Sequence, residues 1–159
     1  MQIYASGFAA VALGAARAAL DAFVELASGK TPALAQTALR DSAVIRSAIG
    51  IADAKLKSAR CWLIHVLHEA QEAVALAGEL TTTERLAIRQ ASTYAIHQAK
   101  EVVDVAYHEA GATAIFDANP FERRFRDVNT VTQQVQGRRA HFETIGQYLL
   151  GGEPNPRWL

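Results

Sequence analysis

Histidines and carboxylates recur at helical spacing in two parts of the chain, and helical bundles build metal sites from this pattern. The first group is His65, His68, Glu69 and Glu72, and the second is His97, Glu101, Asp104 and His108. A carboxylate-bridged di-iron bundle needs Glu-x-x-His on each of two helices and a further Glu from each of two others. Neither Glu-x-x-His nor Asp-x-x-His occurs in the sequence. We therefore predict no metal site and interpret both groups as solvated or subunit-facing surfaces, with a ferritin-like metal-binding bundle as an alternative.

Nucleophilic catalysis has few candidate residues. The single cysteine, Cys61, excludes a disulfide within the chain and a cysteine-rich metal site. Its position beside Trp62 in a helical pattern favours a buried, inert thiol. No Gly-x-Ser-x-Gly turn, P-loop or Gly-x-Gly-x-x-Gly run is present. The sequence therefore does not indicate a self-contained enzyme.

Polar side chains are densest in residues 119–134, where signals for a helix start precede a run of charges and amides. Asn119 can cap this helix, Pro120 suits its first position, and Glu122 stands where a capping box closes. The hydrogen-bonding side chains that follow are Arg123, Arg126, Asp127, Asn129, Gln133 and Gln134. A helix that only covered a core would not need so many of them.

Arginines cluster on this helix and just after it, where the pattern suggests that they are partly buried. They are Arg123, Arg124, Arg126, Arg138 and Arg139. One interpretation pairs them in ion pairs with Glu122, Asp127 and Glu143. The other places one or two of them against a phosphate or the edge of a cofactor. The residues alone favour the ion pairs, and both interpretations stay open.

Apolar residues recur at helical spacing through most of the chain. The predicted helices are residues 3–28, 42–77, 81–111, 119–134 and 138–150. Asp41 or Ser42 caps the second helix, which is about 54 Å long, and Thr81 with Glu84 forms a capping box for the third. Val11 and Val74 belong to the predicted apolar faces. Residues 30–40 and 112–118 are predicted connections, and residues 151–159 a tail that lies extended.

Long helices without a convincing strand predict an all-α fold, an antiparallel four-helix bundle with short extra C-terminal helices, as a single domain over residues 1–159. Half of the residues are hydrophobic, and only 4 prolines and 10 glycines interrupt them. The helices are longer than a compact monomer needs. Their alanine-rich faces are therefore expected to pack against other subunits in a homo-oligomer, a dimer or a tetramer.

The charge pattern argues against nucleic acid as a partner, because the formal net charge is +0 and phosphate backbones attract basic surfaces. No signal peptide is evident. Arg17 and Asp21 interrupt the first apolar stretch well short of the roughly 20 residues that cross a bilayer. We therefore expect a cytoplasmic protein without a membrane span.

The run PFERRFRD at residues 120–127, preceded by VVDVAYHEAG at residues 102–111, resembles the C-terminal helical domain of the acyl-CoA dehydrogenase superfamily. In particular it resembles the type 2 form, which that superfamily shares with two-component aromatic monooxygenases that use reduced flavin. SGKTP at residues 28–32 and SAR at residues 58–60 fit the same pattern. The resemblance covers essentially the whole chain.

This resemblance implies a four-helix bundle that mediates tetramer formation and forms part of the wall of a flavin site, some of it across a subunit interface. Family members carry a helical and a β-barrel-like domain upstream, and neither is found in this sequence. We therefore expect a fragment, an isolated domain or an unusual short protein. FAD or FMN is expected only together with those domains, supplied by the rest of a longer chain, and no cofactor is expected for this chain alone.

The resemblance also implies where a flavin would lie. Dehydrogenase members commonly have a glutamate base a few residues after the Arg-Asp pair, and monooxygenase members often have histidines. This chain has Asn129, Gln133 and Gln134 there, and an amide can orient a carbonyl oxygen but cannot act as a general base at neutral pH. Arg126 is a further candidate cofactor contact, and an ion pair with Asp127 that fixes the helix is the favoured role.

The function implied is therefore the C-terminal domain of a flavin-dependent oxidoreductase or monooxygenase that is inactive on its own. A non-enzymatic helical oligomerisation or interaction module is the alternative. The sequence does not choose between dehydrogenation and hydroxylation, and it does not identify a substrate.

Overall fold

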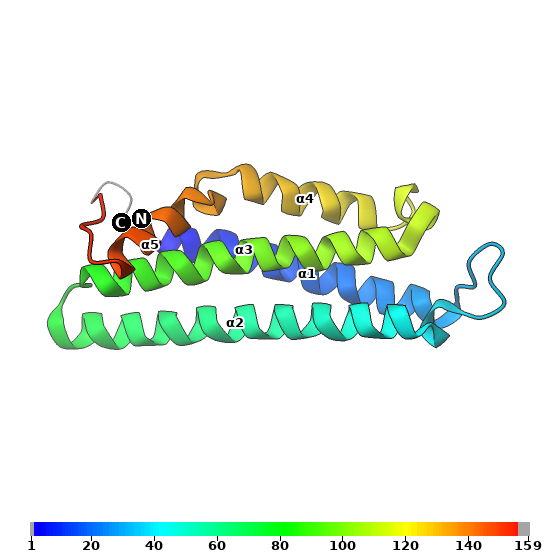
Figure 1. Ribbon diagram of the computed structural model, residues 1–159, viewed down its shortest axis with the longest axis horizontal. Coiled ribbons are helices and arrows are strands. Elements are labelled where there is room, and N and C mark those ends of the chain that lie inside the picture. Colours follow the sequence, from blue (N-terminus) through cyan, green and yellow to red (C-terminus); the bar gives the residue numbers. More distant parts are fainter. Residues whose placement is uncertain (1, 156–159) are drawn as a thin grey trace.

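The computed structural model describes residues 2–155, and no strand occurs among them. Three long helices form its body: α1 (Gln2–Gly29), α2 (Ala43–Ala77) and α3 (Thr82–Ala110). Two shorter helices follow, α4 (Phe121–Gln133) and α5 (Ala140–Leu149). Three 3₁₀ segments lie in the connections: η1 (Leu39–Asp41) between α1 and α2, η2 (Gly111–Ile115) between α3 and α4, and η3 (Val135–Gly137) between α4 and α5. α1 to α4 lie side by side along one axis (Figure 1), which confirms the predicted all-α bundle with short C-terminal helices.

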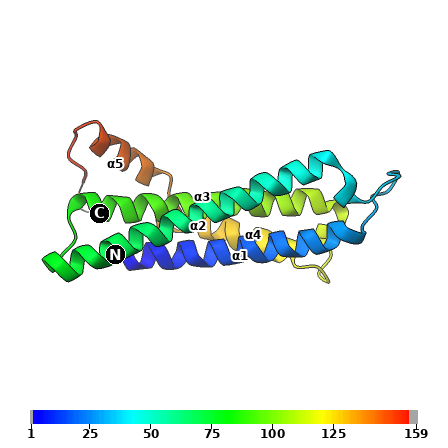
Figure 2. The same ribbon diagram turned by 90° about the horizontal axis from the view of Figure 1, so that it is seen from below.

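α3 is the central helix of the bundle. It packs against α1, α2, α4 and α5, whereas α1 and α2 contact each other much less. α2 crosses the others at a shallow angle, as the view from below shows (Figure 2). Small side chains let the neighbouring helices approach α3 closely. Its fully buried alanines are Ala91, Ala95, Ala99, Ala106 and Ala110.

The ends of the long helices follow the predicted signals. Thr81 and Glu84 form the capping box at the start of α3, with the Thr81 backbone N–H donating to Glu84 Oε2 over 2.6 Å. Gly78 ends α2 in the left-handed conformation, at φ 80°, which glycine adopts without strain. Ser42 occupies the predicted position before α2, but its side chain makes no capping hydrogen bond.

The predicted start of the helix at residues 119–134 is wrong. α4 begins at Phe121, and the Asn119 side chain does not cap it. Asn119 Nδ2 instead donates to the Thr113 carbonyl over 3.1 Å, inside the η2 connection. Lys30 Nζ also donates to Thr113, over 2.7 Å to Oγ1. Tertiary contacts of this connection therefore take up the side chain that local rules assign to the helix.

Several residues lie on other faces than predicted. Cys61 is exposed, and so are Val11 and Val74. α2 packs on the bundle by one stripe only, which passes beside Cys61; its members are Ala52, Leu56, Ala59, Leu63, Val66 and Ala70. The predicted extended tail is also wrong at its start, where the Gly152 N–H donates to the Gln147 carbonyl over 2.9 Å. Residues 156–159 of that tail lie outside the described residues.

α1 is long and apolar enough to cross a membrane by length and composition alone. Within the bundle the same composition serves a core helix, because Ala9, Ala12, Ala16 and Ala19 are fully buried. Arg17 in its middle donates to Asp53 of α2 over 3.0 Å. The packing against α3 thus accounts for the apolar character of α1.

We predict that Ala95→Leu destabilises the protein by about 1–3 kcal/mol, since extra methylenes in a filled core force side chains and backbone apart. Ala95 has 0% exposure, so the new side chain has no open space to enter. Urea unfolding followed by circular dichroism measures the change. Ala54→Leu on the exposed side of α2 is the matched control and should stay within about 0.5 kcal/mol of the parent. An equal loss in both variants would contradict close packing around α3.

Candidate functional site

Three side chains of α3 hold the η3 turn, which connects α4 to α5. Arg89 Nη1 donates to Gln136 Oε1, and Thr93 Oγ1 donates to the Gln136 carbonyl over 3.2 Å. His97 Nε2 lies 2.9 Å from the Gly137 carbonyl oxygen. The three side chains recur every four residues, so they share one face of the helix. α3 therefore determines where the chain leaves α4.

The η3 turn is also bonded from its other side. Gln134 Oε1 accepts the Gln136 backbone N–H over 2.7 Å. His141, at the start of α5, places Nε2 2.8 Å from the Val135 carbonyl oxygen. Gln136 and His141 are both buried. A short turn with this many side-chain bonds is held in one conformation rather than left to vary.

Arg89 carries a buried charge without an acidic partner. It is 2% exposed, and among the described residues no carboxylate pairs with it. Its Nε has no hydrogen-bond partner there either. Burial lowers the pKa of Arg89, because desolvation disfavours the charged form. Leaving a charge buried and unpaired is costly, so this arginine is an unusual element for a structural core.

His141 lies in the same positive surroundings. Burial lowers its pKa most strongly, and the charges of Arg89 and Arg138 lower it further. The hydrogen bond to the Val135 carbonyl acts in the opposite direction, because it favours the protonated ring. The net effect keeps this histidine in its neutral form to lower pH than an exposed one.

Gly137 is required at its position by the backbone around it. A Cβ atom there would lie 2.8 Å from the Val131 carbonyl oxygen and 3.0 Å from that of Thr132. Both contacts are to backbone, which cannot move aside as a flexible side chain can. The end of α4 and the turn after it therefore pack backbone against backbone.

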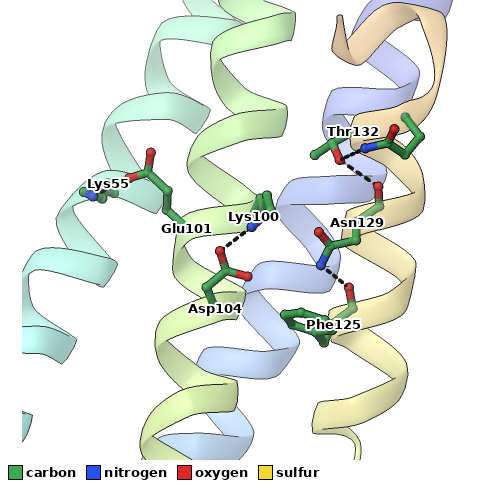
Figure 3. Close-up of polar contacts among 8 residues, drawn as sticks. Lys55, Lys100, Glu101, Asp104, Phe125, Asn129 and Thr132 are labelled. Atoms are coloured by element: carbon green, nitrogen blue, oxygen red, sulfur yellow. Dashed lines mark hydrogen bonds and ion pairs between the residues drawn. The ribbon is translucent and has the colours of Figure 1, made fainter. Parts of the chain in front are cut away.

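The residues predicted to contact a cofactor do not share one surface. Asn129 points from α4 toward the bundle, as its neighbour Thr132 does, near Lys100 and Asp104 of α3 (Figure 3). Asn129 Nδ2 donates to the Phe125 carbonyl over 2.8 Å, and Gln133 Nε2 reaches Thr132 Oγ1 at 3.4 Å. Gln133 is exposed at the end of the helix. Gln134, by contrast, has turned its amide oxygen into η3.

Arg126 lies on the solvent side and does not form the predicted pair with Asp127. Its Nε is 2.7 Å from Glu122 Oε1, and its side chain is 70% exposed. Asp127 is instead approached by Arg123 at 4.0 Å and by Arg124 at 3.8 Å. The arginines of α4 therefore form ion pairs within the helix, and the expectation that they are buried is wrong for Arg123 and Arg126. The buried arginine of this region is Arg89.

A cleft of about 420 Å³ opens where α3, the end of α4 and the segment after η3 meet. We call it the α3–η3 cleft. Its polar lining includes Lys100 from α3, Gln133 from α4, and Arg138 and Arg139. These groups donate hydrogen bonds, and the lining offers no paired nucleophile and base. Among the described residues no three His, Cys, Asp or Glu side chains converge on a point where a metal ion would sit.

Sequence reasoning missed the residues that hold η3. Arg89 and Thr93 were not singled out, and His97 was read only as a potential metal ligand. His141 was not singled out either. The signal that could have found them is the four-residue recurrence of polar side chains on a helix otherwise rich in alanine. Their partners lie more than 40 positions later for Arg89 and Thr93, at separations of 47 and 43.

We predict that Gly137→Ala destabilises the protein by about 1–3 kcal/mol, since the added methyl must displace backbone. Gly146→Ala in α5 is the control, because its Cβ meets nothing within 4 Å. That control should gain about 0.5–1 kcal/mol from helix propensity. Urea unfolding of both variants measures the free energy of unfolding, which should fall in Gly137→Ala and rise in Gly146→Ala. A neutral Gly137→Ala would show that the turn relaxes freely.

Stability should also fall as the pH drops from 8 through the unfolded-state pKa of histidine, about 6.5. The pKa of His141 is lower in the folded state than in the unfolded state. As the pH falls, the unfolded chain therefore binds the proton first, and the free energy of unfolding decreases. His141→Gln should flatten the dependence of unfolding free energy on pH in this window. His68→Gln, exposed on α2, is the control variant. An unchanged slope in His141→Gln would contradict a neutral buried ring.

Comparison with known proteins places this chain in a family. The family model described as acyl-CoA dehydrogenase, C-terminal domain, matches residues 6–138. Indole-3-acetate monooxygenase of Pseudomonas putida is 31% identical over 149 residues, which cover 94% of this chain and 38% of that protein. The oxygenase component of p-hydroxyphenylacetate 3-hydroxylase from Acinetobacter baumannii is 31% identical over 160 residues, which cover 96% and 36%. The chain thus spans less than two fifths of these relatives.

Solved structures of related proteins contain the same helical fold. XiaF from Streptomyces sp., in complex with FADH2 and glycerol, superposes with a TM-score of 0.87 at 26% identity, over 94% of this chain and 38% of XiaF. The HsaA monooxygenase from M. tuberculosis has the same fold, with a TM-score of 0.86 at 19% identity over 99% and 40%. The predicted resemblance is confirmed: this chain belongs to the acyl-CoA dehydrogenase C-terminal domain family, and its relatives include a monooxygenase and a protein solved with FADH2.

Proposed function

We propose that the chain acts as the C-terminal helical domain of a flavin-dependent monooxygenase, where it builds subunit contacts and one wall of the flavin site. The observation that carries this proposal is the match along nearly the whole chain to the corresponding part of two monooxygenases. A relative solved with FADH2 supports a flavin as the cofactor. FAD or FMN would bind only with the further domains of a longer chain.

The residues at the end of α4 fit one wall of such a site. Gln133 is exposed, and among the described residues its amide makes one long hydrogen bond, of 3.4 Å to Thr132, so its donor remains available for a carbonyl oxygen. Val135 beside it presents an apolar side chain that is 39% exposed. An amide donor next to an apolar surface suits the edge and face of a planar heteroaromatic ring. The remaining walls would come from other domains.

The proposed role of this wall is positioning. A reduced flavin, when bound, supplies the electrons for the oxidation. Gln133 would orient a carbonyl oxygen of the flavin or the substrate, and the rigid η3 turn would keep Val135 and Gln133 in place against it. Asn129, committed to the Phe125 carbonyl, would support the helix end rather than touch the ring. The amides of Gln133 and Asn129 cannot act as general bases, so proton transfer would fall to other groups.

The proposal includes a homo-oligomer, a tetramer or a dimer. Large apolar side chains are exposed along the outer side of α2, including Val44 at 72% and Leu76 at 90%. Exposed apolar groups of this kind are typical of surfaces that pack against another subunit. The cytoplasmic setting is also part of the proposal, and the exposed thiol of Cys61 suits a reducing compartment.

A chimera tests the proposal. This chain replaces the matching C-terminal part of the Pseudomonas putida indole-3-acetate monooxygenase, and anaerobic titration measures binding of reduced flavin. We expect the chimera to bind and the 159-residue chain alone not to bind. Gln133→Ala in the chimera should weaken binding by roughly 3–10-fold, the worth of one hydrogen bond. Arg123→Ala on the solvent side of α4 is the matched control and should have no effect.

Two results would contradict this function. One is saturable flavin binding or substrate turnover by the chain alone. The other is a chimera that forms the relative's oligomer by light scattering yet binds no flavin. The second result would favour the alternative, a helical oligomerisation module without a role at a flavin.

A further inference from the structure

The α3–η3 cleft has a lining that is positive overall. Lys100, Arg138 and Arg139 contribute three positive charges to it, and Glu101 contributes one negative charge. Glu101 and Lys100 are each paired with a residue outside the lining: Lys55 Nζ donates to Glu101 Oε2 over 2.5 Å, and Lys100 Nζ donates to Asp104 Oδ2 over 2.5 Å. The positive balance of the lining therefore comes from Arg138 and Arg139. These charges come from α3 and from the segment after η3, so the fold rather than local sequence brings them together.

Arg139 is the group in this lining with the most unused hydrogen-bonding capacity. No hydrogen bond or ion pair with another described residue engages its guanidinium group. Lys100 is bonded to Asp104 Oδ2 over 2.5 Å, at a site that is about one third exposed. A guanidinium group presents paired donors that match the two oxygens of a carboxylate or the oxygens of a phosphate. The amide of Gln133 adds a neutral donor at the mouth.

A second feature adds to the positive potential. Arg89 lies buried behind the η3 turn, bonded to Gln136 next to the lining residue Gly137, and no described carboxylate compensates its charge. The positive field extends to His141, whose pKa is lowered in part by Arg89 and Arg138. A buried charge is poorly screened by water, so it acts on the cleft more strongly than an exposed one.

The wall of the cleft is also formed in advance. His97 and Gly137, which both line it, are joined by the hydrogen bond to the Gly137 carbonyl. The backbone packing at Gly137 prevents this segment from shifting toward α4. Binding of a small ligand would therefore cost little ordering of the protein.

From these observations we propose that the α3–η3 cleft binds the oxyanion group of a small organic ligand, a carboxylate or a phosphate, through Arg139, with Arg138 and Lys100 adding positive charge around it. Its volume of about 420 Å³ is within the range of small-molecule sites. Gln133 belongs both to this cleft and to the proposed flavin wall, but the binding test below uses this chain without flavin, so its outcome is separate from that of the proposed role at a flavin.

NMR titration of the 159-residue chain tests this site. Inorganic phosphate and phenylacetate are added in turn, each against chloride at constant ionic strength. We expect saturable shifts of the Gln133 and Gly137 amides, with millimolar dissociation constants. Tighter binding of phosphate would identify a phosphate ligand, and tighter binding of phenylacetate an aromatic carboxylate. Either result supports the proposal.

Arg139→Gln should raise the dissociation constant by about tenfold, as expected for one charge-assisted contact. Arg123→Gln removes the same charge from the solvent side of α4 and should change it by less than about twofold. Circular dichroism confirms that both variants fold. The proposal is overturned if neither ligand saturates by about 50 mM, or if both variants weaken binding equally, which would indicate a diffuse effect of net charge.

Discussion

The packing of α3 against α1, α2, α4 and α5 is the constraint on which the rest of this structure depends. A helix in the centre of a bundle must present small side chains where its neighbours cross it, and α3 does so with alanines such as Ala95 and Ala99. This close packing leaves room for few polar groups, and buried polar groups are stable when they find partners inside the protein. Arg89, Thr93 and His97 find theirs in the η3 turn. The central helix thus positions the segment at which α4 ends.

The buried charge of Arg89 destabilises the fold, which indicates that this arginine has a further role. An unpaired guanidinium group in a core is destabilising, and an apolar side chain of similar size would pack there without that penalty. The arginine nevertheless secures Gln136 and gives the surrounding surface a positive potential. Both effects act at the place where the wall of a flavin site is proposed and where the α3–η3 cleft opens. Arg89 therefore adds rigidity and positive charge to a surface that its own buried side chain does not reach.

The features that the sequence predicts correctly are those that local signals determine. The capping box of Thr81 and Glu84 and the stop at Gly78 depend on neighbours within a few residues, and the structure contains both. Prediction fails where a distant contact decides. Asn119 bonds across the η2 connection instead of capping α4, and the face of Cys61 depends on how α2 crosses the bundle. The role of Arg89 depends on Gln136, a partner at a separation of 47 residues, so no local pattern reveals it.

The central claim is that α3 holds the η3 turn through buried side chains, and hydrogen exchange in Arg89→Met tests it most directly. Methionine keeps the apolar stem and loses the bond to Gln136. The account predicts faster exchange of the Gly137 and Arg138 amides, which bond within the turn, while the amides in the middle of α3 keep their protection. Unchanged protection of Gly137 and Arg138 in a folded Arg89→Met variant would contradict it.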